Sequence, residues 1–308
     1  MSVYTTVGRD QLSAWLQALA VGPLEDFAGI AAGIQNSNYF VNAGGRRWVL
    51  TLFEHLAPHE LAFYLALQGH LAARGIPCPR PLGTARGELW RPLAGKPAAL
   101  FTCLPGAASA MPDIGQCRAV GEMLARLHAA GADYPAPLPN PCGADWRERV
   151  GRSLAPHLAG GERDLLLAEL DFQAVQNYSG LPRGIIHADL FHDNVLWQPD
   201  GELSGILDFY FAGEDCLLFD LAVVANDWCD DAERLRALLA GYAAQRPLTA
   251  QEAAAWPAMR RAAALRFWLL RLEVRQQPRS GAVVTIKDPD HFCRLLQRLR
   301  LAPGGLPR

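Results

Sequence analysis

The spacing of hydrophobic and polar positions separates the first third of the chain from the rest. Two β-rich runs, YFVN and RWVLTLF, flank the residues AGG near position 44, and this arrangement predicts a β-hairpin. Leucines then recur at helical spacing between Pro58 and Gly75, a glycine placed where a helix would end. The runs GELW and PAALFTCL predict two further strands. Residues 1–104 are therefore predicted to form a small antiparallel sheet with one main helix.

Helical patterns dominate the remainder of the chain, residues 105–308. The amphipathic run DIGQCRAVGEMLARLHAAG predicts a helix, and further helical patterns cover 162–178 and 217–276. The break at Pro105 and Gly106 follows the last predicted strand and is the expected domain boundary. The pattern thus predicts an α+β protein of two lobes, a small N-terminal one and a larger, mostly helical C-terminal one.

Composition narrows the class of protein. Half of the 308 residues are apolar and 19% are charged, which is typical of a globular chain. The formal net charge of −2 gives no basic field for nucleic acid, and no run of eighteen apolar residues predicts a membrane span. Seven scattered cysteines without a C-x-x-C pair fit neither a disulfide framework nor a zinc site. We therefore expect a soluble, cytoplasmic protein with no nucleic-acid or membrane partner.

One dense cluster of polar residues lies between two apolar runs. In HADLFHDN, Asp189 and Asn194 stand five residues apart, which is the spacing of the kinase catalytic loop. Downstream, ILDFY places Asp208 at the end of a short apolar strand. Mg²⁺ prefers hard oxygen ligands, usually one or two from the protein and the rest from phosphates and water. The cluster therefore predicts phosphoryl transfer, and the alternative is a polar turn whose side chains satisfy the local backbone.

The chain resembles the aminoglycoside phosphotransferase and choline kinase superfamily, whose members share a protein-kinase-like fold. Within it, the chain is most similar to the homoserine kinases that adopt this fold. The likeness covers nearly the whole chain, including GIQNSNYFV, HADLFHDNVLW, GILDFYFAG, DLAVVANDWC and RFWLLRL. It implies a two-lobed, protein-kinase-like fold and ATP- and Mg²⁺-dependent phosphorylation of the side-chain hydroxyl of L-homoserine, on the path to threonine. As assemblies, a monomer or a homodimer are both expected.

The resemblance also implies roles for individual residues. Asp189 would accept or orient the substrate hydroxyl, while Asn194 and Asp208 would hold Mg²⁺. His187 would brace the loop. The residues implied to lie closest to the nucleotide belong to a phosphate loop and to a hinge that pairs with adenine, and they are Gly33, Asn36, Ser37, Asn38, Phe101 and Cys103.

One position departs from the kinase pattern. Kinases place a lysine on the strand after the phosphate loop, but WVLTLF has Thr51 there, and the only lysines are Lys96 and Lys287. We include Thr51 in the expected nucleotide site, and Glu60 on the following helix lacks its expected ion-pair partner. The phosphate charge would then be met by Mg²⁺, by backbone amides, or by arginines such as Arg47 and Arg91.

The substrate can be narrowed from the C-terminal residues. The stretch WPAMRRAAALRFWLLRLEVRQQPR carries six arginines and one acid, and Arg266 and Arg271 lie among apolar residues. A guanidinium in a cleft is best explained by a bidentate carboxylate partner, and Asp215, Asp193 or Asp227 could bind an ammonium. The alternative is a solvated helix face, or arginines paired with nearby acids. The candidate substrate-binding residues are Asp193, Tyr210, Asp227, Trp228, Arg266 and Arg271, although aromatic residues at helical spacing more often belong to a core.

Two rival functions remain open. A related kinase acting on an aminoglycoside, choline or ethanolamine would need an acidic pocket or an aromatic cage, which the arginine-rich stretch disfavours. An inactive, kinase-like binding protein is suggested by the missing strand lysine. The presence of Asp189, Asn194 and Asp208 together argues against it.

Overall fold

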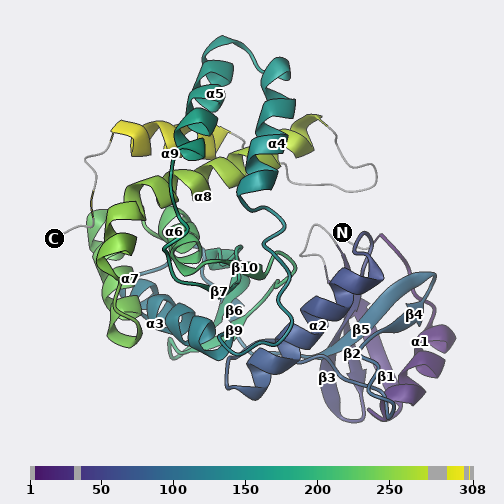
Figure 1. The fold of residues 1–308 in the computed structure, drawn as a ribbon. Coiled ribbons are helices and arrows are strands. Elements are labelled where there is room, and N and C mark those ends of the chain that lie inside the picture. Colours follow the sequence, from purple (N-terminus) through teal and green to yellow (C-terminus); the bar gives the residue numbers. More distant parts are fainter. Residues whose placement is uncertain (1–3, 31–35, 277–289, 302–304, 306–308) are drawn as a thin grey trace. The chain divides into compact units, whose positions relative to one another are not determined.

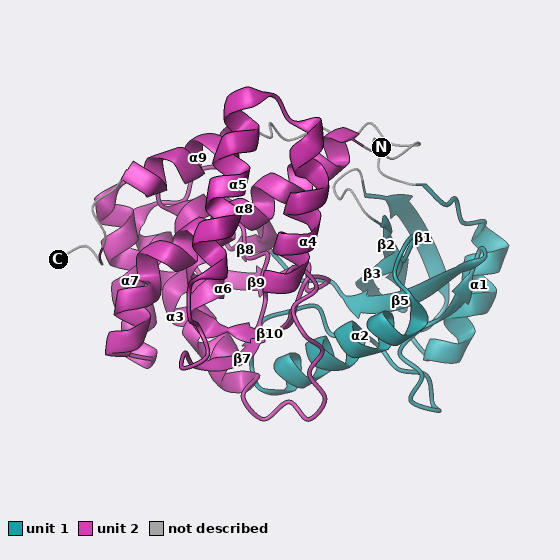
Figure 2. Ribbon diagram, turned by 45° about the horizontal axis from the view of Figure 1, so that its top comes forward, with its two compact units in different colours: residues 1–105, 279–285 teal, residues 106–278, 286–308 magenta. Residues whose placement is uncertain are grey.

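The computed structural model describes residues 4–30, 36–276, 290–301 and 305. The chain divides into two compact units, residues 1–105 with 279–285, and residues 106–278 with 286–308 (Figure 2). Within the described residues, no helix is long and apolar enough to cross a membrane. That the units correspond to the domains expected at 1–104 and 105–308 stays a prediction.

The first unit contains a five-stranded antiparallel sheet with the strand order β1-β2-β3-β5-β4 (Figure 1). Its strands are β1 (Leu24–Gly29), β2 (Ser37–Ala43), β3 (Arg46–Leu52), β4 (Arg91–Leu93) and β5 (Lys96–Thr102). Its helical segments are α1 (Arg9–Leu16), the 3₁₀ turn η1 (Gln17–Leu19) and α2 (Pro58–Ala73). The small antiparallel sheet with one main helix, predicted from the pattern, is present.

The predicted hairpin forms between β2 and β3, which pair from Ala43↔Arg46 to Ser37↔Leu52. Gly44 and Gly45 connect the strands with φ of 58° and 72°, the left-handed conformation that tight hairpin turns require. The predicted strand GELW is wrong by a few residues, because Gly87 has a φ of 81° and turns the chain before β4 begins at Arg91.

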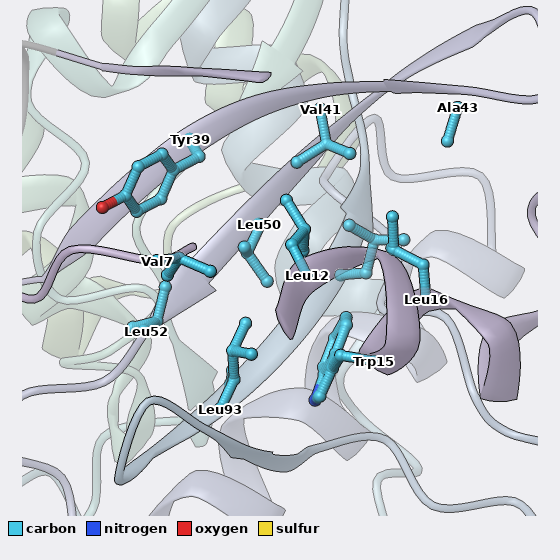
Figure 3. Close-up of a cluster of buried hydrophobic side chains, with 12 residues drawn as sticks. Val7, Leu12, Trp15, Leu16, Tyr39, Val41, Ala43, Leu50, Leu52 and Leu93 are labelled. Atoms are coloured by element: carbon cyan, nitrogen blue, oxygen red, sulfur yellow. The ribbon is translucent and has the colours of Figure 1, made fainter. Parts of the chain in front are cut away.

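Alternating side chains of β2 and the apolar face of α1 build one hydrophobic core of this unit. In the buried cluster Val41 of β2 points toward Leu12 of α1, and the Tyr39 ring lies beside Val7 (Figure 3). Trp15 and Leu16 of α1 belong to the same cluster. Val41 and Leu12 have no exposed surface. This period of two on the strand against one helical face is the packing that makes a small sheet stable.

The second unit is mostly helical (Figure 1). Its helices are α3 (Ile114–Ala130), α4 (Ala144–Leu154), α5 (Gly160–Ala174), α6 (Leu217–Trp228), α7 (Ala232–Gln245), α8 (Ala250–Gln276) and α9 (Asp290–Leu301), with 3₁₀ turns η2 (Ala155–His157) and η3 (His192–Asn194). Two small sheets complete it: β7 (Arg183–Ile186) with β10 (Gly213–Cys216), and β6 (Ala107–Ala108), β8 (Val195–Trp197) and β9 (Leu203–Ile206). The sequence pattern did not predict α4, whose apolar face is interrupted by the buried Arg147.

Candidate active site

The catalytic-loop motif leaves β7 and makes a turn that a buried carboxylate holds. Ala188 adopts a left-handed conformation with φ of 63°, which is strained for a residue other than glycine. Asp220 of α6 compensates: its carboxylate accepts the backbone N–H groups of His187 at 2.7 Å and Ala188 at 2.8 Å. His128 of α3 lies 3.1 Å from the same carboxylate through Nε2. Three separate elements therefore fix the turn that precedes Asp189.

Asp220 is ionised despite complete burial. Burial by itself would raise the pKa of this carboxyl, but the hydrogen bonds from His128 and from the His187 backbone, with the nearby imidazoles, outweigh it and lower the pKa below its ordinary value. The sequence analysis missed Asp220 and His128. Nothing in the local pattern around either residue distinguishes it from other polar positions on an amphipathic helix.

His187 braces the loop from inside. Its Nδ1 accepts the backbone N–H of Asp189 at 3.1 Å, so the proton of the neutral ring lies on Nε2, which is 2.8 Å from the Leu207 carbonyl oxygen. Burial lowers the pKa of this imidazole, although the Asp220 carboxylate acts in the opposite direction. A neutral His187 therefore connects the backbone of Asp189 to the strand that leads to Asp208, in agreement with the bracing role expected of it.

Asn194 and Asp208 are brought together by the β8–β9 hairpin. Val195 pairs with Ile206, and the Leu207 N–H donates to the Asn194 carbonyl oxygen at 2.9 Å. The Asn194 side-chain nitrogen donates to the Asp189 carbonyl oxygen at 2.8 Å. Because that nitrogen is occupied, the side-chain oxygen of Asn194 is the atom that can bind a cation.

The carboxyl of Asp208 lies in a crowded acidic environment. Its pKa is raised to about 6, first because surrounding protein shields the carboxyl from water and second because the Asp193 carboxylate lies nearby; a backbone hydrogen bond from Tyr210 acts in the opposite direction. The residue is nevertheless exposed, so an ion can reach it from solvent. The Asp208 carboxylate and the Asn194 amide oxygen are donors of the kind that fits Mg²⁺. In the described part of the chain no group of three or more His, Cys, Asp or Glu side chains is placed to hold a metal ion.

Comparison with known proteins identifies the family. A model described as the phosphotransferase enzyme family matches residues 26–265. The chain belongs to this family. A homoserine kinase from Methylobacillus flagellatus is 47% identical over 96% of this chain and 95% of its own length, and one from Cupriavidus taiwanensis is 46% identical over 97% and 95%. The family resemblance stated from the sequence is therefore confirmed.

Solved structures agree on the fold. An amicoumacin kinase in complex with AMP-PNP and Ca²⁺ has a TM-score of 0.69 at 17% identity and covers 95% of this chain and 92% of that chain. A choline kinase from Streptococcus pneumoniae has a TM-score of 0.67 at 14% identity, covering 95% and 97%. These likenesses confirm the α+β, protein-kinase-like fold class. The family model and the curated relatives show that the chain is a phosphotransferase.

Arg266 of the phosphotransferase lies beneath the catalytic loop. Its side chain has no exposed surface, and Nη1 donates to the Ala188 carbonyl oxygen at 2.5 Å and lies 3.7 Å from the Asp189 Oδ1. The guanidinium carbon lies 4.2 and 4.7 Å from the ring centroids of Phe267 and Phe211. In this position the Arg266 side chain contacts the loop rather than solvent, and its contact with a substrate carboxylate stays a prediction.

The end of α6 supports the second half of the loop. Both the backbone N–H and the Nδ1 of His192 lie 2.8 Å from Asp227 Oδ2. Trp228 is 2% exposed, and its indole N–H donates to the Leu190 carbonyl oxygen at 3.0 Å. The structure thus brings these two candidate substrate residues to the loop, but as its supports, and it leaves Trp228 almost no surface to offer a substrate.

The remaining substrate candidates differ in accessibility. Asp193 is exposed on η3, and Tyr210 and Arg271 are half-buried. The guanidinium of Arg271 lies 4.3 Å from the Phe292 ring centroid, between α8 and α9. These three residues are reachable from solvent, unlike Arg266.

The nucleotide candidates lie in the first unit, except that Gly33 falls outside the described residues. Ser37 is buried; its hydroxyl accepts the N–H of Thr5 at 2.9 Å and donates to Glu54 at 2.7 Å. Thr51 donates to Asn38 at 2.8 Å, and Asn36 accepts the Glu54 N–H at 3.4 Å. These four candidate side chains are therefore engaged within the sheet region.

The hinge candidates differ from one another. Phe101 is 2% exposed on β5, where it pairs with Val49 of β3. Cys103 is half-buried just beyond the strand, and burial raises the pKa of its thiol although Arg47 acts in the opposite direction.

The structure shows what lies near the position of the missing strand lysine and what Glu60 contacts. Lys96 of β5 places Nζ 3.0 Å from Glu54 Oε2, immediately past β3, so the neighbouring strand supplies an ammonium at this end of the sheet. Glu60 accepts the N–H of Ala57 at 3.0 Å and caps its own helix. Sequence reasoning excluded Lys96 because it lies on another strand; only the β3–β5 pairing brings it beside Glu54.

Proposed function

We propose that this phosphotransferase is a homoserine kinase, which transfers the γ-phosphoryl group of ATP to the side-chain hydroxyl of L-homoserine and yields O-phospho-L-homoserine and ADP. The observation that carries the proposal is the 46–47% identity to proteins named homoserine kinases, over almost the full length of both chains. The arrangement of Asp189, Asn194 and Asp208 supports it chemically.

In the proposed reaction Asp189 receives the proton of the substrate hydroxyl as the hydroxyl oxygen bonds to the γ-phosphorus and the bond to the departing ADP breaks. The loop holds Asp189 in position, because its N–H is bound by His187 and its carbonyl oxygen by Asn194. Positioning of this kind supplies much of the rate enhancement in phosphoryl transfer.

The proposed metal is Mg²⁺, held by the side-chain oxygen of Asn194 and the Asp208 carboxylate. When bound, it would neutralise charge on the nucleotide phosphates. The raised pKa of Asp208 supports a cation here, because a carboxyl that holds its proton beside another carboxylate gains most from a neighbouring positive charge.

The proposed substrate contacts are those that solvent can reach. Arg271 is the candidate for the carboxylate, with Asp193 for the ammonium and Tyr210 beside them. Asp227 contributes by fixing His192 next to Asp193. For the nucleotide, we propose the backbone of residues 36–38 and the chain around Phe101 and Cys103, with Thr51 and Lys96 near the same end of the sheet.

The test is ADP release from ATP and Mg²⁺ with L-homoserine, run beside choline, kanamycin, L-serine and no acceptor, with the product identified by phosphorus NMR. Turnover confined to L-homoserine is expected, and Asp189→Asn should abolish it while retaining nucleotide binding. Turnover with only choline or kanamycin would refute the assignment of L-homoserine as the substrate. Nucleotide binding without turnover on any acceptor would favour the inactive binding protein instead.

A further inference from the structure

The second unit contains a cavity that the proposed reaction does not use. It has a volume of about 180 Å³ and is lined by the start of α4, by Tyr178 and Ser179 before β7, by residues of β7 and β10, and by residues of α6 and α8. None of its lining residues belongs to the catalytic loop. For comparison, an engineered cavity of about 150 Å³ holds a benzene molecule, so the space suits a ligand of six to eight non-hydrogen atoms.

Arg147 gives this cavity a buried positive charge. The residue is 6% exposed, its Nη1 donates to the Cys142 carbonyl oxygen at 3.3 Å, and its guanidinium carbon lies 5.1 Å from the Phe219 ring centroid. Among the described residues no carboxylate forms an ion pair with it. Burial lowers the pKa of the guanidinium, partly offset by Asp215. A buried cation that has no carboxylate in ion-pair contact among the described residues is costly, which makes an anionic ligand the natural complement.

The start of α4 adds to the attraction for an anion. The helix begins at Ala144, a cavity-lining residue, and no side chain caps its first N–H groups. Helix N-termini carry partial positive charge and favour carboxylates. Asp145 lies in the same turn, but it is exposed and does not line the cavity.

Another wall of the cavity carries the Asp215 carboxylate beside the Arg183 guanidinium. Asp215 accepts the Cys216 N–H at 2.7 Å through Oδ1 and the Asn140 amide at 2.9 Å through Oδ2. Arg183, half-exposed, lies 3.4 Å from Asp215 and 3.7 Å from Glu214. A carboxylate can accept more hydrogen bonds than these, so Asp215 can also receive an ammonium.

From this arrangement we propose that the cavity is a binding site for a small α-amino acid. The ligand carboxylate lies against Arg147 and the start of α4, and the ligand ammonium lies against Asp215. Within unit 2 the site is separate from the catalytic loop, because the two lie at opposite ends of the paired strands β7 and β10. Arg183 and Cys216, which line the cavity, form the pair at one end, and Ile186, which precedes the catalytic loop, pairs with Gly213 at the other. That separation from the substrate site rests on the proposed function, whereas binding in the cavity does not.

Calorimetric titration and thermal-shift measurements test the site in the full chain carrying Asp189→Asn, without nucleotide. The probes are L-alanine, L-serine, L-threonine and L-valine, with propionate lacking the ammonium, isopropylamine lacking the carboxylate, and inorganic phosphate. At least one amino acid should bind and raise the melting temperature, and the single-function probes should bind at least about tenfold more weakly, as expected when a charged hydrogen-bond partner is missing.

Variants locate the binding. Arg147→Met should weaken it about tenfold or more. Ala144→Glu should do the same by placing a carboxylate where the ligand would lie, and it should fold because an acid at a helix start is favourable. The control is Arg152→Met, an exposed arginine of the same helix paired with Glu148 and Asp171, which should bind like the parent.

The proposal is overturned if no amino acid binds, if binding survives both Arg147→Met and Ala144→Glu, or if phosphate or propionate binds as tightly as the amino acids. It is also overturned if Arg147→Met, in the otherwise unaltered enzyme, lowers turnover, since Arg147 would then belong to the substrate site. Because binding is measured without turnover, these results would still test the cavity site even if the protein did not phosphorylate L-homoserine.

Discussion

Two buried arginines in the second unit have opposite surroundings. Arg266 has a carbonyl oxygen at 2.5 Å, a carboxylate at 3.7 Å and two aromatic rings against it, with no exposed surface. Arg147 has one carbonyl oxygen at 3.3 Å and a cavity beside it. The first guanidinium is bound to the catalytic loop through Nη1, although its Nε and Nη2 are buried without a hydrogen-bond partner among the described residues. The second lies against the Phe219 ring and borders the cavity, with no ion pair among the described residues.

The comparison shows that a buried arginine can serve two different purposes. A buried charge with a partner organises the chain around it, as Arg266 and Asp220 do for the catalytic loop. A buried charge without a partner keeps an electrostatic cost that a ligand can relieve. Asp208 is the negative counterpart of Arg147, because shielding from water and then the Asp193 carboxylate raise the pKa of its carboxyl, and a cation would relieve both effects.

The largest effect is expected at the best-partnered charge. Asp220→Ala leaves the N–H groups of His187 and Ala188 buried without an acceptor, so the unfolding free energy should fall by about 3–5 kcal/mol. Urea unfolding measures it. Asp171→Ala, which removes an exposed acid paired with Arg152, is the control and should cost no more than about 1 kcal/mol. Equal losses in the two variants would contradict the importance of the loop network.

Arg266→Met should reduce kcat about 100-fold, the effect expected when a catalytic group shifts by about 1 Å, with little change in KM. Arg266→Lys should recover part of the loss, because an ammonium can still reach the Ala188 carbonyl oxygen. Arg261→Met on the same helix removes an ion pair with Glu169 at 2.6 Å and is the matched control: stability should fall and kcat should not. A normal kcat in Arg266→Met would place Arg266 among purely structural residues.

Arg147→Met tests whether the guanidinium beside the cavity destabilises the ligand-free protein. Without ligand, the unfolding free energy should stay unchanged or rise by about 1 kcal/mol, since a desolvated, unpaired charge is replaced by an apolar side chain of similar length. Chemical denaturation of the ligand-free variant gives the answer. A loss of more than about 2 kcal/mol would mean that Arg147 has a stabilising partner in the free protein.

The smallest effect concerns Asp208 and pH. Its folded-state pKa, about 6, lies above its ordinary value of 3.8, so in the metal-free protein its contribution to stability is complete below pH 3.8 and is lost as pH rises through 6. Asp208→Asn should therefore be slightly more stable than the parent at pH 7.5, by less than about 1 kcal/mol because the group is exposed, and not at pH 4. Denaturation of both proteins at both pH values without Mg²⁺ measures the difference. A variant less stable than the parent at pH 7.5 would show that the charged Asp208 carboxylate does not destabilise the folded protein.

Much of the fold and the centre of the site followed from the sequence. Periods of 2 and 3.6 in the apolar positions marked the N-terminal sheet and most of the helices, and two glycines marked the β2–β3 turn. The spacing of Asp189 and Asn194 and the strand before Asp208 predicted residues that the structure does bring together around one loop. Local sequence determines such features because neighbouring residues share one element, and the geometry of that element fixes their relative positions.

Partners distant in the sequence were decided only by the tertiary structure. Asp220 reaches back to His187, Asp227 is occupied by His192, and Lys96 meets Glu54 through the pairing of two strands. The sequence placed Arg266 among apolar residues but could not say that it lies under the loop rather than facing a substrate, nor that Arg147 borders a cavity. Burial and ion pairing depend on which surfaces of separate elements pack together, and that choice is made by the whole chain minimising exposed apolar surface and unpaired charge at once.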